Sequence, residues 1–188
     1  MRKIIAPVVA TIIGLAAAPA FCEDWYAGLG IGQGHLNMSG QDLTGLNNAS
    51  VNKTDTSYTV RGGYMFHPNF GVEVGYYDLG SYGFNGMVGN TAVSGSAKAK
   101  AYGISLVALA PLSPQFDVYG RVGWSDSQIK ANANTALATA STSDWQAGAT
   151  YGVGGHWNFS KQVGVFAEWM KNDKIEVDSY LIGIDFRF

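Results

Sequence analysis

Several features that are common in soluble proteins are scarce in this sequence. Cysteine occurs once among 188 residues, so the chain cannot build an internal disulfide framework. Only 14% of the residues are charged, and the 12 basic residues are outnumbered by 14 acidic ones. A formal net charge of −2 excludes the basic surface that nucleic-acid binding requires. The length suits one domain.

Long apolar runs are absent except at the N-terminus. Residues 1–22 begin with Arg2 and Lys3, continue through an apolar stretch and end in small residues, which is the order of a secretory signal peptide. We predict that it is cleaved after Ala20 or Cys22, leaving a domain over residues 23–188. A membrane anchor is the alternative, but this apolar stretch is short for one. No other run could cross a membrane as a helix.

Alternation with a period of two replaces continuous hydrophobicity in the rest of the chain. Tyr58, Val60 and Tyr64 share one parity, while Thr59 and Arg61 lie on the other. This pattern is typical of a strand with one apolar face. The sequence predicts eight such strands, at residues 25–34, 58–66, 70–77, 102–108, 118–124, 145–157, 163–170 and 179–188.

The connections between these strands alternate in length. Three are short and lie around Pro68, at residues 111–115 and at residues 158–161. The others are longer and polar, at residues 35–55, 80–99, 126–144 and 171–178. This alternation is typical of outer-membrane barrels. We therefore predict an all-β fold, an eight-stranded antiparallel transmembrane β-barrel with short periplasmic turns and longer extracellular loops in the bacterial outer membrane.

A soluble β-sandwich or lipocalin-like barrel would also alternate. The second face of these strands is rich in Gly, Ser, Thr, Gln, Glu and Arg, which is too polar for a dry core. The apolar face instead carries aromatic residues near the strand ends, as membrane-interface girdles do. The girdle residues that we predict are Trp25, Phe66, Phe70, Tyr76, Trp124, Trp145, Trp157, Trp169 and Tyr180.

Four charged residues have inward parity at membrane depth. Arg61 and Glu73 flank a short turn and would be diagonal neighbours, while Arg121 and Glu168 lie on later strands. Charges there need partners, because isolated buried charges cost several kcal/mol. We interpret the four as an ionic network that plugs the lumen; a narrow gated path for ions or water is the alternative. Four residues could hydrogen-bond around them: Tyr77, Tyr119, Gln146 and Thr150.

Four segments, residues 71–80, 117–123, 167–169 and 183–188, resemble strands of the OmpA-type (OmpA/OmpX-like) small outer-membrane barrels. The resemblance concerns the barrel domain alone, not the peptidoglycan-binding domain that usually follows it. It implies an ionic network that includes Glu73, Glu168 and Arg121 and is linked to small-ion passage. Where the family has a lysine on the fourth strand this chain has Leu109, and Arg61 would supply the missing charge.

The C-terminus carries a second expectation. Gly183, Phe186 and the final Phe188 resemble the signal that the barrel assembly machinery recognises during biogenesis. An ordinary lipid-facing strand is the alternative interpretation.

The function expected from the sequence is structural or surface-interacting, through the extracellular loops, in a monomeric protein. The partners expected are outer-membrane lipid, lipopolysaccharide and an extracellular ligand that the loop composition does not identify. A conduit for small solutes is the alternative. A lipid A-modifying enzyme is less favoured, because the three histidines His35, His67 and His156 form no acyl-transfer arrangement with serine and carboxylate. No cofactor or metal site is expected.

Overall fold

The computed structural model describes residues 25–37, 47–88, 91–135 and 139–188, and the predicted signal peptide lies outside these ranges. Within them, no helix is long and apolar enough to cross a membrane. The strands are β1 (Trp25–Leu36), β2 (Asn47–Val51), β3 (Thr54–His67), β4 (Phe70–Val88), β5 (Thr91–Pro111), β6 (Phe116–Thr135), β7 (Thr139–Asn158), β8 (Val163–Asn172) and β9 (Val177–Arg187).

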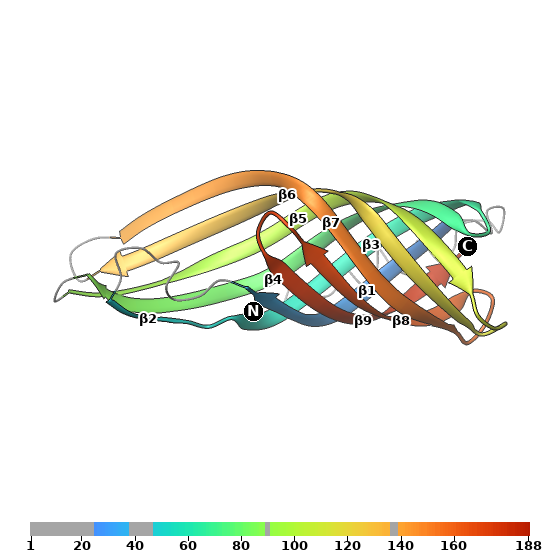
Figure 1. Ribbon diagram of the computed structural model, residues 1–188, viewed down its shortest axis with the longest axis horizontal. Helices are drawn as coiled ribbons and strands as arrows, with labels where there is room; N and C mark the ends of the chain where they lie inside the picture. The colour runs from blue at the N-terminus through green and yellow to red at the C-terminus, as the bar shows by residue number, and fades with distance from the viewer. Residues whose placement is uncertain (1–24, 38–46, 89–90, 136–138) are drawn as a thin grey trace, which may run out of the picture.

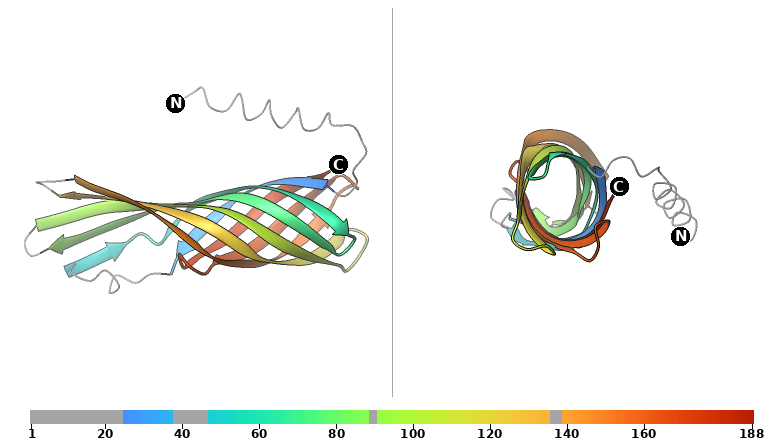
Figure 2. Two further views of the ribbon diagram at one scale, coloured as in Figure 1. Left: turned by 90° about the horizontal axis from the view of Figure 1, so that it is seen from above. Right: turned by 90° about the vertical axis from the view of Figure 1, so that its right-hand side faces the viewer.

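Eight of these strands close into an antiparallel barrel. Neighbours in the sequence pair with one another, β1 pairs with β9, and β4 pairs with β5, so every strand of the ring has two partners. β2 stands outside the ring and pairs with the outer end of β4. The view along the barrel shows the closed ring (Figure 2). The predicted eight-stranded barrel is therefore confirmed, and closure leaves no unpaired edge within the ring.

The turns at one end are tight and are held by side chains. The hydroxyl of Ser113 accepts hydrogen bonds from the amides of Gln115 and Phe116, and that of Ser160 accepts from Gln162 and Val163. These Ser-stabilised turns match the short connections predicted on the periplasmic side.

The other end differs from the prediction. Residues 80–99 and 126–144, which we expected to be loops, are mostly strand, because β4 to β7 continue well beyond the ends of β8 and β9 (Figure 1). We call these outer ends, residues 81–88, 91–98, 130–135 and 139–148, together with β2, the projecting sheet. Outside lipid neither face of a strand has to be apolar, so the alternation here is weaker: at residues 97–101 and 130–134 it sets only alanine against lysine or asparagine.

A β-bulge on β4 marks the start of the projecting sheet. The register with β5 shifts between Asp78 and Gly80, and Gly80 has a φ of 103°, which only glycine adopts readily. The bulge changes which parity faces inward, so Leu79 and Tyr82 are both buried. Both side chains therefore close over the outer end of the lumen.

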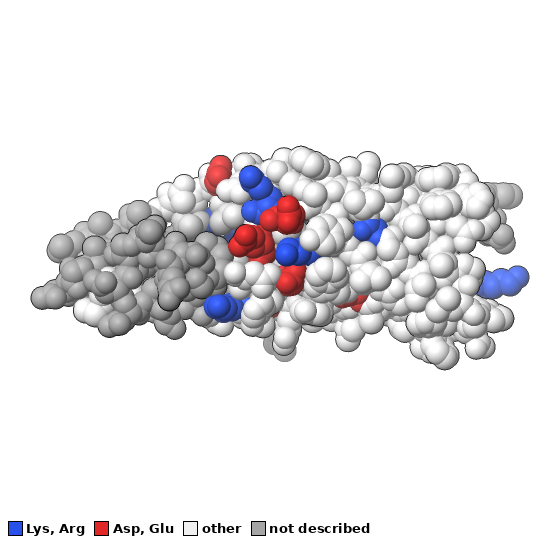
Figure 3. All heavy atoms as spheres, viewed as in Figure 1, with Lys and Arg blue, Asp and Glu red and all other residues white. Residues whose placement is uncertain are grey.

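The barrel wall has the polarity of a membrane protein. Large apolar side chains project outward over the full circumference, among them Val74, Ile104, Val122 and Ile182, each at least half exposed. On the face shown in Figure 3, most charged side chains gather near the outer ends of β8 and β9, and the wall beyond is nearly uncharged. An uncharged outer wall and a charged interior are the inverse of a soluble protein.

Candidate functional site: the barrel lumen

The four charged residues singled out by parity meet inside the barrel. Arg61 Nη1 lies 2.8 Å from Glu168 Oε2, and Arg121 Nη1 lies 2.6 Å from Glu73 Oε1. Each arginine also reaches the other glutamate, with Arg61 Nε 3.6 Å from Glu73 Oε2 and Arg121 Nε 3.2 Å from Glu168 Oε1. The two guanidiniums and two carboxylates thus form a closed ring of ion pairs, with each residue at most 5% exposed.

The register explains how Arg61 and Glu73 reach each other. Arg61 pairs with Gly75, and Glu73 pairs with Gly63, so the two charges are diagonal neighbours on β3 and β4, as expected from the turn. Leu109 packs against an apolar cluster, and Arg61 carries the second positive charge of the network.

Asp185 is a third carboxylate of this site that the sequence analysis did not select. Arg61 Nη2 lies 2.9 Å from Asp185 Oδ2, on β9. Asp185 has inward parity and a charge, so the signal was present, but parity alone does not show which strands face one another across a barrel. Two guanidiniums therefore face three carboxylates.

Aromatic residues complete the network. The hydroxyl of Tyr119 donates to Glu168 at 2.6 Å, and that of Tyr26 donates to Glu73 at 2.9 Å. Tyr77 accepts a hydrogen bond from Arg121. The guanidinium carbon of Arg61 lies 3.8 Å from the centre of the Phe166 ring. Tyr77 and Tyr119 thus take the places that we predicted, whereas Tyr26 and Phe166 were missed.

Gln146 and Thr150 do not join the network. Gln146 donates to Asp144 at 3.2 Å, near the outer end of β7. Thr150 is buried, but its hydroxyl donates to the backbone carbonyl of Lys171. Our expectation that these two side chains surround the charges is wrong, because β7 is tilted and places them outward of Arg121.

Glycines on β1 make the close approach possible. A Cβ atom at Gly28 would collide with the carboxylate of Asp185 and lie 2.9 Å from Arg61 Nε. A Cβ atom at Gly30 would lie 2.9 Å from the ring of Phe166. The inward face of β1 therefore leaves the volume that the charged and aromatic side chains fill.

A second group of charges extends the network toward the periplasmic end. His156 Nε2 lies 3.2 Å from Asp185 Oδ2, and His156 Nδ1 lies 3.7 Å from Asp117 Oδ2. Arg187 Nη2 lies 3.3 Å from His156 Nδ1 and 3.7 Å from Asp117 Oδ2. The ionic contacts thus run without a gap from the middle of the lumen to its rim.

The outer part of the lumen is apolar, which the sequence analysis did not foresee. Leu79, Met170 and Val177 are at most 2% exposed, and they pack in one cluster with Tyr82 and Ile175. Beside them Asn172 donates to the hydroxyls of Ser125 and Ser127. The lumen is therefore filled in two layers, an ionic one in the middle and an apolar one toward the projecting sheet.

The predicted girdle residues all lie on the outer wall. Seven are about half exposed or more, while Tyr76 and Trp169 are partly buried. Trp25 packs against Tyr64 at one end, with ring centres 5.0 Å apart, and Tyr76 packs against Tyr102 at the other, at 5.1 Å. Amphipathic rings at both ends of an apolar band are placed as membrane interfaces require.

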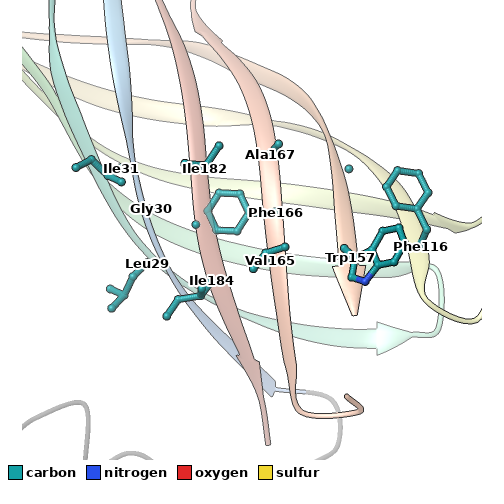
Figure 4. Close-up of a pocket in the computed structure, with 12 residues that line it drawn as sticks. Leu29, Gly30, Ile31, Phe116, Trp157, Val165, Phe166, Ala167, Ile182 and Ile184 are labelled. Atoms are coloured by element: carbon teal, nitrogen blue, oxygen red, sulfur yellow. The ribbon is translucent and has the colours of Figure 1, made fainter. Parts of the chain in front are cut away.

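The apolar wall is hollowed between the girdles. One hollow of about 830 Å³ lies over β1, β9, β8 and β7. Ile31, Ile182, Trp157 and the small Ala167 are among the residues that line it (Figure 4). Hollows with small residues at their floor leave room for lipid chains on the outer wall.

A closed antiparallel barrel with an apolar outer wall, two aromatic girdles and an ionic interior defines a transmembrane β-barrel of the outer-membrane class. Residues 7–188 match the family described as "Outer membrane protein beta-barrel domain", and the chain belongs to that family. It is a protein of the bacterial outer membrane.

Relatives with known names agree with this assignment. Outer membrane protein A of Klebsiella pneumoniae is 28% identical over 169 residues, which cover 86% of this chain and 47% of that protein. Outer membrane protein A of Shigella dysenteriae is 27% identical over 191 residues, covering 97% of this chain and 51% of that protein. The chain thus spans about half the length of the curated relatives it matches.

Solved structures share the fold. OprG of Pseudomonas aeruginosa superimposes with a TM-score of 0.64 at 15% identity, covering 89% of this chain and 96% of that one. Ail, the attachment invasion locus protein of Yersinia pestis, in complex with the heparin analogue sucrose octasulfate, gives 0.55 at 18% identity, covering 88% and 99%.

Proposed function

We propose that the protein is a structural and surface-interaction component of the outer membrane and that it acts through the projecting sheet. The observation that carries this proposal is the continuation of β4 to β7 as paired strands beyond the membrane-spanning barrel. Ordered strands present backbone and side chains to a partner at a lower entropic cost than flexible loops do.

The edge of β7 supports a binding mode. The pairing of β7 with β8 begins at Thr150, so outward of Gly148 the described part of β7 pairs with β6 alone. The carbonyl of Ala149 accepts from Asp173 on the β8 side, so by alternation Ser143 and Ala147 turn their backbone groups to that same free side. A free edge of this kind binds an extended segment of another protein as an added strand.

Shortening each hairpin tests this proposal. Removing residues 129–144 and joining Gln128 to Trp145 by an Asn-Gly turn deletes most of the free edge, including Ser143, because Gln128 and Trp145 are direct partners. Removing residues 84–95 shortens the β4–β5 hairpin in the same way and leaves the β7 edge intact. Bacteria expressing each variant are compared for adhesion to laminin, fibronectin and heparin surfaces and for phage plating. We expect the first variant alone to lose binding; unchanged binding by both would refute the proposal.

A narrow ion or water path is a second candidate, favoured by one cavity. A space of about 300 Å³ is lined by Arg61 and Glu73 of the ionic ring and by His156 and Arg187 toward the periplasmic rim, so it reaches the ring from that rim. Against conduction, the apolar cluster around Leu79 fills the outer lumen. Single-channel recording of wild type and Glu73→Gln in planar bilayers distinguishes a conducting lumen from a closed one. Asp144→Asn, at an exposed position, is the control. We expect identical closed traces; openings confined to Glu73→Gln would assign a gate to the ring.

We also propose that the protein is not an enzyme. His156 is the histidine inside the barrel, and the ionic and hydrogen-bonding partners of its ring nitrogens are Asp117, Asp185 and Arg187 rather than a serine. Mass spectrometry of lipid A from cells with and without the protein tests this proposal. We expect identical acylation patterns; a chain lost or added in expressing cells would show catalysis.

A further inference from the structure

Three lysines share the outward face of the barrel just beyond the outer girdle. Lys98 on β5 and Lys130 on β6 are direct cross-strand partners, and Lys100 lies two residues from Lys98 toward the membrane. The β5–β6 register has no bulge, so all three project from the same face as Tyr102. We call Lys98, Lys100 and Lys130 the lysine patch.

The patch carries positive charge that the described protein does not neutralise. Like charges directly opposite one another destabilise a sheet, yet Lys98 and Lys130 are both exposed and neither lies within 4 Å of a described carboxylate. Two acids lie near its inner edge: Asp78, 3.8 Å from Lys100, and Asp126, the partner of Tyr102. The three lysines thus face two carboxylates, both near Lys100, and this leaves Lys98 and Lys130 free to hold an anion.

The height of the patch matches the headgroups of the outer leaflet. Lys98 is four residues beyond Tyr102, which corresponds to roughly 13 Å along the strand. A strand tilt of about 40° places Lys98 and Lys130 about 10 Å above the aromatic ring that marks the interface.

A groove on the lipid-facing wall begins directly below the patch. It has a volume of about 800 Å³ and runs between Tyr76 and Tyr102 at the outer end and Trp25 at the other. Small residues, Ala27 and Gly62, lie side by side in it. The Lys100 ammonium lies 5.9 Å from the centre of the Tyr76 ring, so the groove and the patch are continuous.

We propose that the lysine patch and this groove together bind a phosphate-bearing lipid of the outer leaflet. Its phosphate lies between Lys98 and Lys130 and relieves their repulsion. One of its acyl chains fills the groove over Gly62. Charge complementarity, the height of the patch and its continuity with an apolar groove each favour an acylated anion over a soluble one.

Affinity for purified lipid A tests the headgroup half of the site. Tryptophan fluorescence of the protein in neutral micelles reports binding, since Trp124 projects from the same wall of β6. Each lysine near an anionic surface contributes about fivefold in affinity, so we expect Lys98→Gln and Lys130→Gln each to weaken binding about fivefold and the double variant roughly 25-fold. Dephosphorylated lipid A should bind wild type as weakly as lipid A binds the double variant. Lys161→Gln, in an exposed turn at the opposite end, is the matched control.

The acyl half is tested by filling the groove. A Cβ atom at Gly62 would meet only the Tyr26 carbonyl, at 3.7 Å, so Gly62→Leu fits the fold and occupies the groove. Gly120→Leu, with an equally open Cβ position at 3.9 Å from the Gly152 carbonyl, is the control outside it. We expect Gly62→Leu alone to weaken lipid A binding several-fold while leaving binding of the deacylated phosphosugar unchanged.

Two results would overturn the proposal. Wild-type affinity in the Lys98→Gln/Lys130→Gln double variant would show that the patch does not hold the phosphate. Equal affinity of wild type for the deacylated phosphosugar and for lipid A would show a site for soluble phosphates rather than for a lipid.

Discussion

Arg61 on β3 and Glu168 on β8 meet across the lumen, with Nη1 and Oε2 2.8 Å apart, although two strands separate β3 from β8 around the ring. The contact joins opposite walls of the barrel. Arg61 also holds Asp185 of β9, so one guanidinium ties together strands that are more than 100 residues apart in sequence.

Removing this guanidinium should destabilise the barrel strongly. Arg61→Met leaves Glu168 and Asp185 buried with less compensation, so we expect the free energy of unfolding to fall by about 3–5 kcal/mol. Asp185→Asn removes the third carboxylate, which exceeds the two guanidiniums, so it should lower the free energy of unfolding by less than Arg61→Met does. Both free energies of unfolding are measured by denaturing the vesicle-bound protein with guanidinium chloride. The double variant should lose less than the sum of the singles, and strict additivity would show that the two residues do not interact.

Gly183 should be required for packing as well as for any assembly signal. A Cβ atom there would collide with the Leu29 carbonyl and the Phe166 ring, so we expect Gly183→Ala to destabilise the refolded barrel by about 1–3 kcal/mol. Gly120→Ala, whose Cβ position is open, should change stability little. Refolding into vesicles without any cellular machinery isolates the packing effect; a fully stable Gly183→Ala barrel would contradict it.

Phe188 should matter for assembly in cells more than for stability. Its side chain is half-buried on the outer wall, and its backbone amide already bonds to the Trp25 carbonyl. We expect Phe188→Ala to lower the folded fraction in outer membranes several-fold but to refold in vesicles as wild type does. Phe70→Ala, another aromatic at the same end, controls for girdle contacts. Equal losses in both variants would assign Phe188 to the girdle alone.

Asn172 should anchor the outer end of β8. It is 1% exposed, donates to Ser125 and Ser127, and accepts from the amide of Ile175 in the turn before β9. Asn172→Ala leaves these groups unpaired in an enclosed space, so we expect a loss of about 2–4 kcal/mol. Thermal unfolding of the vesicle-bound protein measures it. Ser141→Ala, exposed on the outer part of β7, is a control that should leave the transition unchanged.

The lumen could be predicted from the sequence only in part. Parity placed Arg61, Glu73, Arg121 and Glu168 inside, and the turn after β3 gave the diagonal contact between the first two. Asp185 and Tyr26 have the same inward parity, but their contacts depend on how β9 and β1 are staggered against β3. That stagger is set by barrel closure, which no local pattern encodes.

The alternation along the chain by itself determined which face of each membrane-crossing strand meets lipid. The reason is that hydrocarbon tolerates only apolar side chains and requires the sheet to be closed. Beyond the hydrocarbon this constraint is absent, and residues 81–88 and 130–135 were not predicted as strand. Tertiary structure alone decided the rest: the bulge at Gly80 that turns Tyr82 inward beside Leu79, the apolar seal that these two form, and the pairing of Lys98 with Lys130. Each of these features depends on the register between strands. Pairing between the strands fixes that register, and the sequence of a single strand does not.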